Sequence, residues 1–197
     1  MCWNAEVSLN TFIFGIVSAI IVLILNKLKY HLVLILLSFT SIQLLEYFAW
    51  KNLNNKKVIR ILSIIGIQII FIQLLLLNYY LPPTQKQKII LTSAVVITYI
   101  LFLLFQFPYV KLDMEKSKIN KHLIWHWLDL PLFWLLIGFL FYLIPCYLTN
   151  NIYVFTFGIL TLTFSLYNYY KYKTWGSMWC YISNSLWIFA IIISILY

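Results

Sequence analysis

Residues 58–80 read VIRILSIIGIQIIFIQLLLLNYY, an apolar run in which Arg60 is the one charged side chain. A helix needs about 20 mostly apolar residues to cross the hydrocarbon core of a bilayer. Comparable runs recur along the chain, and we expect helices at about 8–26, 31–50, 58–80, 89–107, 128–148, 152–170 and 177–196. The sequence therefore predicts an all-α fold, a polytopic transmembrane helix bundle of about seven spans that occupies residues 1–197 as a single domain.

The composition points to the same class of protein. The chain is 63% hydrophobic and 10% charged, with a mean hydropathy of +0.91, whereas a soluble domain is about 25% charged. The lipid bilayer is therefore the expected solvent for most of the surface. The net charge of +9 does not indicate a nucleic-acid partner, because the basic residues lie in short gaps between apolar runs and form no nucleic-acid-binding motif.

The distribution of basic residues predicts an orientation. Numbered from the N-terminus, the even loops carry Lys51, Lys56, Lys57, Arg60, Lys111, Lys116, Lys118, Lys121, Lys171 and Lys173, whereas the odd loops carry only Lys27, Lys29, Lys86 and Lys88. Cytoplasmic loops of membrane proteins are enriched in Lys and Arg. We therefore expect a cytosolic N-terminus and an external C-terminus.

The one long connection, residues 109–127, has two interpretations. Ile119, Leu123 and Trp127 recur at helical spacing among lysines, which is typical of a short helix lying on the membrane surface. The alternative is a solvated interfacial loop.

Glu46 is the only acidic residue well inside a predicted span. Gln43, Glu46 and Trp50 share one helix face. A charge near the bilayer centre costs a few kcal/mol, so such residues are functional candidates by default. Facing the bundle interior, Glu46 could hold a proton, a cation or a substrate amine. The structural alternative is a buried carboxyl group hydrogen-bonded to a neighbouring helix.

The last predicted helix carries a second polar stripe. Ser177, Cys180, Asn184 and Trp187 recur on one face, whereas Trp175 and Trp179 are placed for anchoring at headgroup level. A buried cysteine such as Cys180 commonly serves as a small hydrophobe. The stripe is therefore either a polar site or a packing surface.

Three further patterns suggest structural roles more strongly than chemical ones. His122 and His126 are four residues apart and could share a metal, but this spacing is common and we expect no metal site. Asp129 precedes Pro131, where a carboxylate can cap a helix start. In the first span, small residues favour close helix packing; they are Ser8, Thr11, Gly15 and Ser18.

Most of these candidates fall at the cytosolic ends of their predicted helices. We therefore predict one polar, aromatic-lined site near the cytosolic surface, with the candidate residues Cys2, Gln43, Glu46, Trp50, His126, Trp179, Cys180 and Asn184. In a reducing compartment, Cys2 and Cys180 are expected as thiols rather than as a disulfide.

Three segments carry a resemblance to a known family: the opening MCWNAEVSLNTF, the helix end QLLEYFAWKNLN and the late GSMWCYISN. They resemble a family of small polytopic membrane proteins of large DNA viruses and algae that has no established activity. They are also similar to a bacterial family that opens MCFSA, although Trp3 and Asn4 depart from that pattern. The resemblance implies a shared membrane fold and a viral or host internal membrane. Its motif positions are Cys2, Gln43, Glu46, Trp50, Ser177, Trp179 and Cys180.

Three functions are compatible with the sequence. The first is a transporter-like or channel-like protein that binds a small polar or cationic ligand, with Glu46 as its ion or proton site. The second is a structural subunit of a viral or organellar membrane assembly. The third is a membrane-embedded enzyme that depends on a metal or a thiol. A homo-oligomer is compatible with each, and the sequence names no cofactor.

Overall fold

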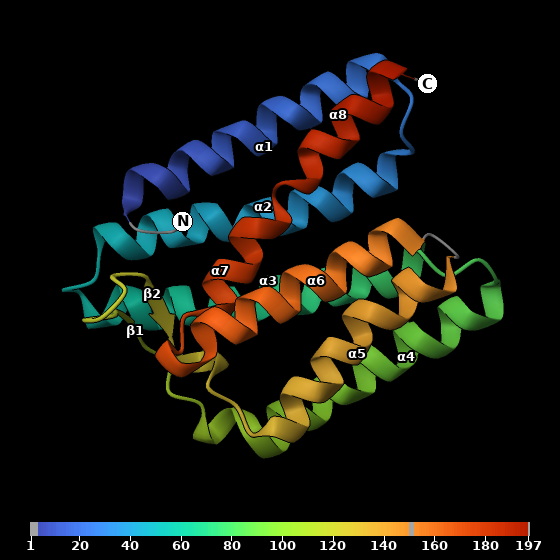
Figure 1. Cartoon of the computed structure of the whole chain (residues 1–197). Helices are drawn as coiled ribbons and strands as arrows, with labels where there is room; N and C mark the ends of the chain where they lie inside the picture. The colour runs from blue at the N-terminus through green and yellow to red at the C-terminus, as the bar shows by residue number, and fades with distance from the viewer. Residues whose placement is uncertain (1–3, 150–151, 197) are drawn as a thin grey trace.

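The computed structural model describes residues 4–149 and 152–196 as an antiparallel helix bundle (Figure 1). Its helices are α1 (Ala5–Leu25), α2 (Tyr30–Lys51), α3 (Lys56–Tyr80), α4 (Gln85–Leu101), α5 (Leu132–Leu148), α6 (Ile152–Tyr169), α7 (Trp175–Ser183) and α8 (Leu186–Leu196). Asn184 and Ser185 interrupt the last segment between α7 and α8. The predicted all-α fold class is confirmed.

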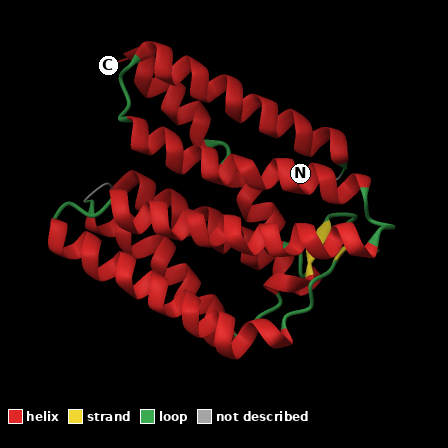
Figure 2. Cartoon of the chain, turned by 180° about the vertical axis from the view of Figure 1, so that it is seen from behind, coloured by secondary structure: helices red, strands yellow, loops and turns green. Residues whose placement is uncertain are grey.

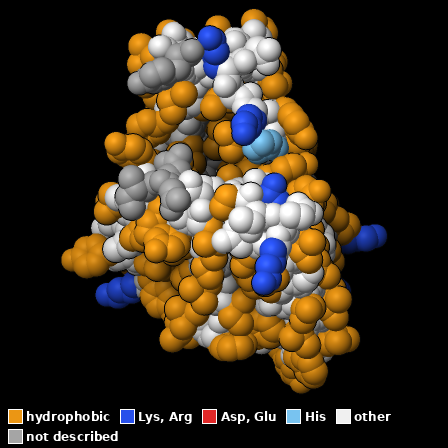
Figure 3. Space-filling view, turned by 90° about the vertical axis from the view of Figure 1, so that its right-hand side faces the viewer, with side chains coloured by type: hydrophobic (Ala, Val, Ile, Leu, Met, Phe, Trp, Pro, Cys, Tyr) orange, Lys and Arg blue, Asp and Glu red, His pale blue; other side chains and the backbone are white. Residues whose placement is uncertain are grey.

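Within residues 4–149 and 152–196, five helices are long and apolar enough to cross a membrane. They are Ala5–Leu25, Tyr30–Lys51, Lys56–Tyr80, Gln85–Tyr109 and Trp175–Leu196, whereas α5 is apolar over a shorter stretch. Large hydrophobic side chains lie exposed along these helices, and they cover the flanks in the end-on view of Figure 3. Such a surface suits an integral membrane protein, because lipid tails rather than water contact it.

Helices α1, α3 and α4 begin earlier than predicted because polar residues cap their starts, whereas α5 begins later than predicted, at Leu132. The Asn4 side chain accepts a hydrogen bond from the Val7 N–H group, and Asn55 does the same for Val58. Thr84 and Gln87 form a reciprocal capping box at the start of α4. These contacts satisfy N–H groups that the first turn of a helix leaves free.

The bundle has two distinct ends. The end of α2 and the starts of α3, α5 and α7 lie together with a small β-hairpin at one end, and the C-terminus lies at the other (Figures 1 and 2). We name them the hairpin end and the opposite end. Figure 3 looks onto the opposite end, where a hollow opens between the helices.

Residues 109–127 form neither a surface helix nor a fully solvated loop. Strand β1 (Met114–Lys116) pairs antiparallel with β2 (Leu123–Trp125), and Met114 faces Trp125 in the register. The helical interpretation is wrong because Leu123, Trp125 and Trp127, at every second position, are all buried. Ile119, which was expected on the same face as Leu123 and Trp127, is 74% exposed. Period-two burial is typical of a strand.

Helix α4 continues into an irregular end. Phe102–Gln106 form a π-helical turn and Phe107–Tyr109 a 3-10 turn. The Phe107 N–H bonds to the Phe102 carbonyl, five residues earlier, instead of to the carbonyl four residues earlier as in an α-helix. This irregular end carries the chain from α4 toward the hairpin.

The small-residue stripe of α1 has the packing role that the sequence suggested. Ser8, Gly15 and Ser18 are buried. A Cβ atom placed on Gly15 would lie 2.4 Å from Thr40 Cγ2 of α2. Only glycine therefore permits this approach of the two backbones.

Candidate functional site

A buried polar cluster links α2 to α7 at the hairpin end of the bundle. Glu46 and Gln43 lie one turn apart on α2 and are both 0% exposed. The Ser177 hydroxyl, on the first turn of α7, donates a hydrogen bond of 2.5 Å to Glu46 Oε1. Cys180 follows one turn later and is also buried. We name these four residues the polar cluster, and all four belong to the sequence motifs.

Asn184 belongs to a second, deeper network. Its Oδ1 accepts a hydrogen bond of 2.9 Å from Thr40 Oγ1, and its Nδ2 donates to the Cys180 carbonyl at 2.8 Å. The Trp187 indole N–H donates to Thr40 Oγ1 at 2.8 Å. This network closes the break between α7 and α8 against α2.

The two candidate tryptophans, Trp50 and Trp179, contact residues outside the polar cluster. The Trp179 indole N–H donates to Thr161 Oγ1 of α6 at 3.2 Å, and its ring meets Tyr142 of α5 edge-on. Trp50 packs against the hydrophobic core that includes the hairpin. Cys2, the remaining motif residue, lies outside the described residues.

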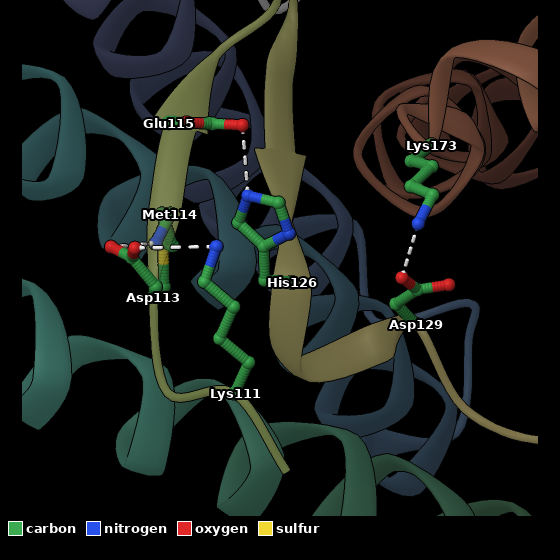
Figure 4. Close-up of polar contacts among 7 residues, drawn as sticks. All are labelled: Lys111, Asp113, Met114, Glu115, His126, Asp129 and Lys173. Carbon is green, nitrogen blue, oxygen red and sulfur yellow. Dashed lines mark hydrogen bonds and ion pairs between the residues drawn. The ribbon is translucent and has the colours of Figure 1, made fainter.

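His126 pairs within the hairpin region rather than with Glu46. Its Nε2 lies 2.9 Å from Glu115 Oε1, and Lys111 pairs with Asp113 on the same strand connection (Figure 4). His122 is buried with its ring edge against Tyr169. The two histidines thus have different surroundings. Among the described residues, no group of three or more His, Cys, Asp or Glu side chains could hold a metal ion.

Asp129 does not cap α5, so that prediction is wrong. Pro131 occupies the N-cap position without a side-chain hydrogen bond. The Asp129 carboxylate instead accepts a hydrogen bond of 2.5 Å from Lys173 Nζ, which precedes α7 (Figure 4). Because the proline ring fixes the backbone angle φ at the start of α5, the helix does not need the Asp129 carboxylate as a cap. The carboxylate instead joins the connection before α5 to the connection before α7.

An apolar cavity of about 150 Å³ lies between α3, α4, α5 and α7. Aromatic side chains dominate its wall; they include Phe71, Tyr99, Phe102, Trp125, Trp127, Trp134, Phe139, Tyr142, Trp175 and Trp179. Trp125 and Trp127 stack with ring centroids 4.9 Å apart. At Gly138 of α5, an added Cβ would meet nothing within 4 Å. This glycine therefore leaves room that any larger residue would fill.

A second cavity of about 190 Å³ adjoins the first, and we name it the vestibule. Asp129, Lys171, Lys173 and Ser177 supply its polar wall. Six residues line both spaces: Trp125, Leu128, Leu130, Leu135, Trp175 and Gly176. The vestibule therefore connects the lysines before α7 to the Ser177 side of the polar cluster, next to the apolar cavity.

Sequence reasoning missed the cavity and the Thr40–Asn184–Trp187 network. The alternation of Leu123, Trp125 and Trp127 was a signal for the buried hairpin, because period-two spacing favours a strand. The stretch FWLLIGFLFY at residues 133–142, with one glycine among large side chains, was the signal for a void beside α5. Thr40 gave no signal, since a threonine in a span commonly bonds to its own helix.

Comparison with known proteins gives no relative from which a role could be carried over. No family model matches the chain, no curated protein matches it, and no solved structure matches its fold.

Proposed function

We propose that this protein is a transporter-like membrane protein that binds a small amphiphilic molecule at the hairpin end of its bundle. The observation that carries the proposal is the shared wall of the two cavities. An apolar group fits the aromatic cavity, and a polar group fits the vestibule beside Ser177. Ligand sites are commonly concave and largely apolar, with a few polar groups that fix orientation.

The size and lining of the apolar cavity support this choice of ligand. Its volume is about 150 Å³. Cavities of about that size lined by apolar side chains stay dry and accept a molecule such as benzene. Aromatic walls also give a ring or a short chain many close contacts. A hydrated ion would lose its water shell there without compensation.

The test is a binding titration of the purified protein in a neutral detergent. Trp125, Trp127, Trp134, Trp175 and Trp179 line the cavity, so ligand entry should change the tryptophan fluorescence. We expect saturable binding of short-chain alkyl compounds such as hexanol. Gly138→Phe should fill the cavity and weaken binding at least tenfold.

The matched control is Leu140→Phe, which lies on the same helix and is 54% exposed. It adds a phenyl ring toward lipid and should leave binding unchanged. Equal affinity of the wild type and Gly138→Phe would remove the cavity from the function and favour a structural subunit.

Glu46 supports a second element of the proposal, coupling of transport to a proton or a cation. A carboxyl group that is fully buried within a span is costly to retain without a role. In proteoliposomes loaded with a pH-sensitive dye, Glu46→Gln should abolish ligand-driven proton movement while preserving binding to the cavity. Proton movement at the wild-type rate would assign Glu46 to helix packing alone.

The proposed orientation places the hairpin end in the cytosol, because this end holds the more basic loops. Single cysteines introduced at Lys116 and Lys86 should react with an impermeant maleimide from opposite sides of the membrane. Labelling of the Lys116 position from outside intact cells would reverse the orientation.

A further inference from the structure

We infer that the amphiphile is anionic and that its acidic group sits in the vestibule against Lys171 and Lys173. The inference rests on the proposed function, since it names the chemical class of the ligand at that site. It replaces the polar or cationic ligand that Glu46 alone suggested.

The charges on the vestibule wall carry the inference. Two ammonium groups, of Lys171 and Lys173, line it together with one carboxylate, Asp129. Lys173 Nζ already bonds to that carboxylate. Lys171 makes no ion pair with any residue in the described part of the chain. A negative group would therefore complete the pairing, whereas an amine would add a third positive charge.

The start of α7 adds to this preference. Gly176 and Ser177 occupy its first turn and line the vestibule, and Thr174 makes no side-chain cap there. The first N–H groups of a helix lack partners within the helix and favour negative charge. Glu46 is fully buried on the far side of Ser177 and is not among the residues that line the vestibule.

Basic side chains at the same end of the bundle as the vestibule also favour a negatively charged ligand. Lys116, Lys118 and Lys121 are exposed on and near the hairpin, at the same end of the bundle. A concentration of like charge around a cleft raises the local concentration of oppositely charged ligands. The apolar tail would occupy the neighbouring cavity of about 150 Å³. That space suits a single short chain or ring, so the ligand class is a single-tailed acid, either a carboxylate or an alkyl phosphate.

The experiment compares four probes of equal, short chain length: hexanoate, hexyl phosphate, hexanol and hexylamine. Their binding to the purified protein is followed by tryptophan fluorescence in neutral detergent at low and high salt. We expect an acidic probe to bind at least tenfold more tightly than hexanol and to lose this advantage as salt screens the lysines. Lys171→Gln should remove most of the advantage, whereas the control Lys86→Gln, at an exposed lysine of the opposite end, should retain it.

The outcomes separate the inference from the proposed function. Hexanol or hexylamine binding as tightly as the acids, with Gly138→Phe still blocking all of them, would overturn the anionic ligand and leave the cavity intact. No saturable binding of any probe would overturn the proposed function itself. A preference for hexanoate points to free fatty acids, and a preference for hexyl phosphate points to a lipid phosphate; either supports the inference.

Discussion

The α1–α2–α7–α8 side of the bundle is closed by polar contacts, whereas the α3–α4–α5 side borders an apolar cavity that is partly open. On the closed side, Gly15 lets α1 approach Thr40, and Thr40 in turn bonds to Asn184 and Trp187. On the α3–α4–α5 side, which we name the hollow side, the space beside Gly138 is open, and α4 buries only Val95 among its described residues. The difference shows that directional hydrogen bonds and small residues fix some helix pairs, while aromatic side chains leave others with space between them.

The strongest test of this difference replaces one glycine on each side of the bundle by valine. Gly15→Val should destabilise the protein by about 3 kcal/mol, because overpacking a tight contact costs on the order of 1–3 kcal/mol or more. Gly138→Val should stay within about 1 kcal/mol of the wild type, since its added methyl groups enter the cavity. Unfolding of both variants by denaturing detergent measures the difference. Equal destabilisation would mean that the two sides are packed alike.

Removal of the Thr40 hydroxyl group tests the polar contacts of the closed side. Thr40→Val leaves Asn184 Oδ1 and the Trp187 N–H without their bond, which should cost about 1–3 kcal/mol. The control is Thr92→Val on α4, where the buried Oγ1 has no hydrogen-bond partner among the described residues. That variant should be neutral or slightly more stable. A neutral Thr40→Val would contradict the role given to the network.

Tyr99 offers a weaker test on the hollow side. Its hydroxyl donates to Gln68 Oε1 at 2.7 Å, and its ring stacks on Phe71. Tyr99→Phe retains the stacking and removes one partly buried hydrogen bond, so we expect a loss of about 1 kcal/mol. Thermal unfolding of the variant should show this small shift. A loss as large as that of Gly15→Val would mean that the hollow side also depends on polar closure.

The smallest effect is expected where the two sides meet at the vestibule. Asp129 precedes α5 and Lys173 precedes α7, and both side chains are about half exposed. Exposed ion pairs contribute about 0–1 kcal/mol and weaken with salt. Asp129→Asn should therefore lower stability by no more than about 0.5 kcal/mol at low salt, and by less at high salt. A larger, salt-independent loss would show that the pair is needed to join the two sides.

Much of the fold can be predicted from the sequence because backbone polar groups in lipid must form hydrogen bonds within the protein. A helix satisfies its own backbone polar groups, so each apolar run marks a helix, and the predicted range 58–80 lies within α3 at Lys56–Tyr80. The hairpin was missed because lysines and the four-residue spacing of Ile119, Leu123 and Trp127 imitate an amphipathic helix. The burial of Trp125 and Trp127 decides the structure there.

The candidate site was predicted only in part. Gln43, Glu46 and Cys180 meet with Ser177 because each was placed by its position along a helix, which the sequence specifies. The orientation of the His126 and Trp179 side chains depends on partners in other elements, Glu115 on the paired strand in one case and Thr161 on α6 in the other. The cavity depends on how four helices and the hairpin region fail to fill the space between them, and no single segment encodes it.

The π-helical turn at Phe102–Gln106 determines how the hydrogen-bond ladder of α4 ends. The Phe107 N–H bonds to the Phe102 carbonyl, five residues earlier, whereas an α-helix uses the carbonyl four residues earlier. Turns of this kind are rare and are found frequently at functional sites. Because Phe102 also lines the apolar cavity, the least regular part of α4 lies against the space proposed for the ligand.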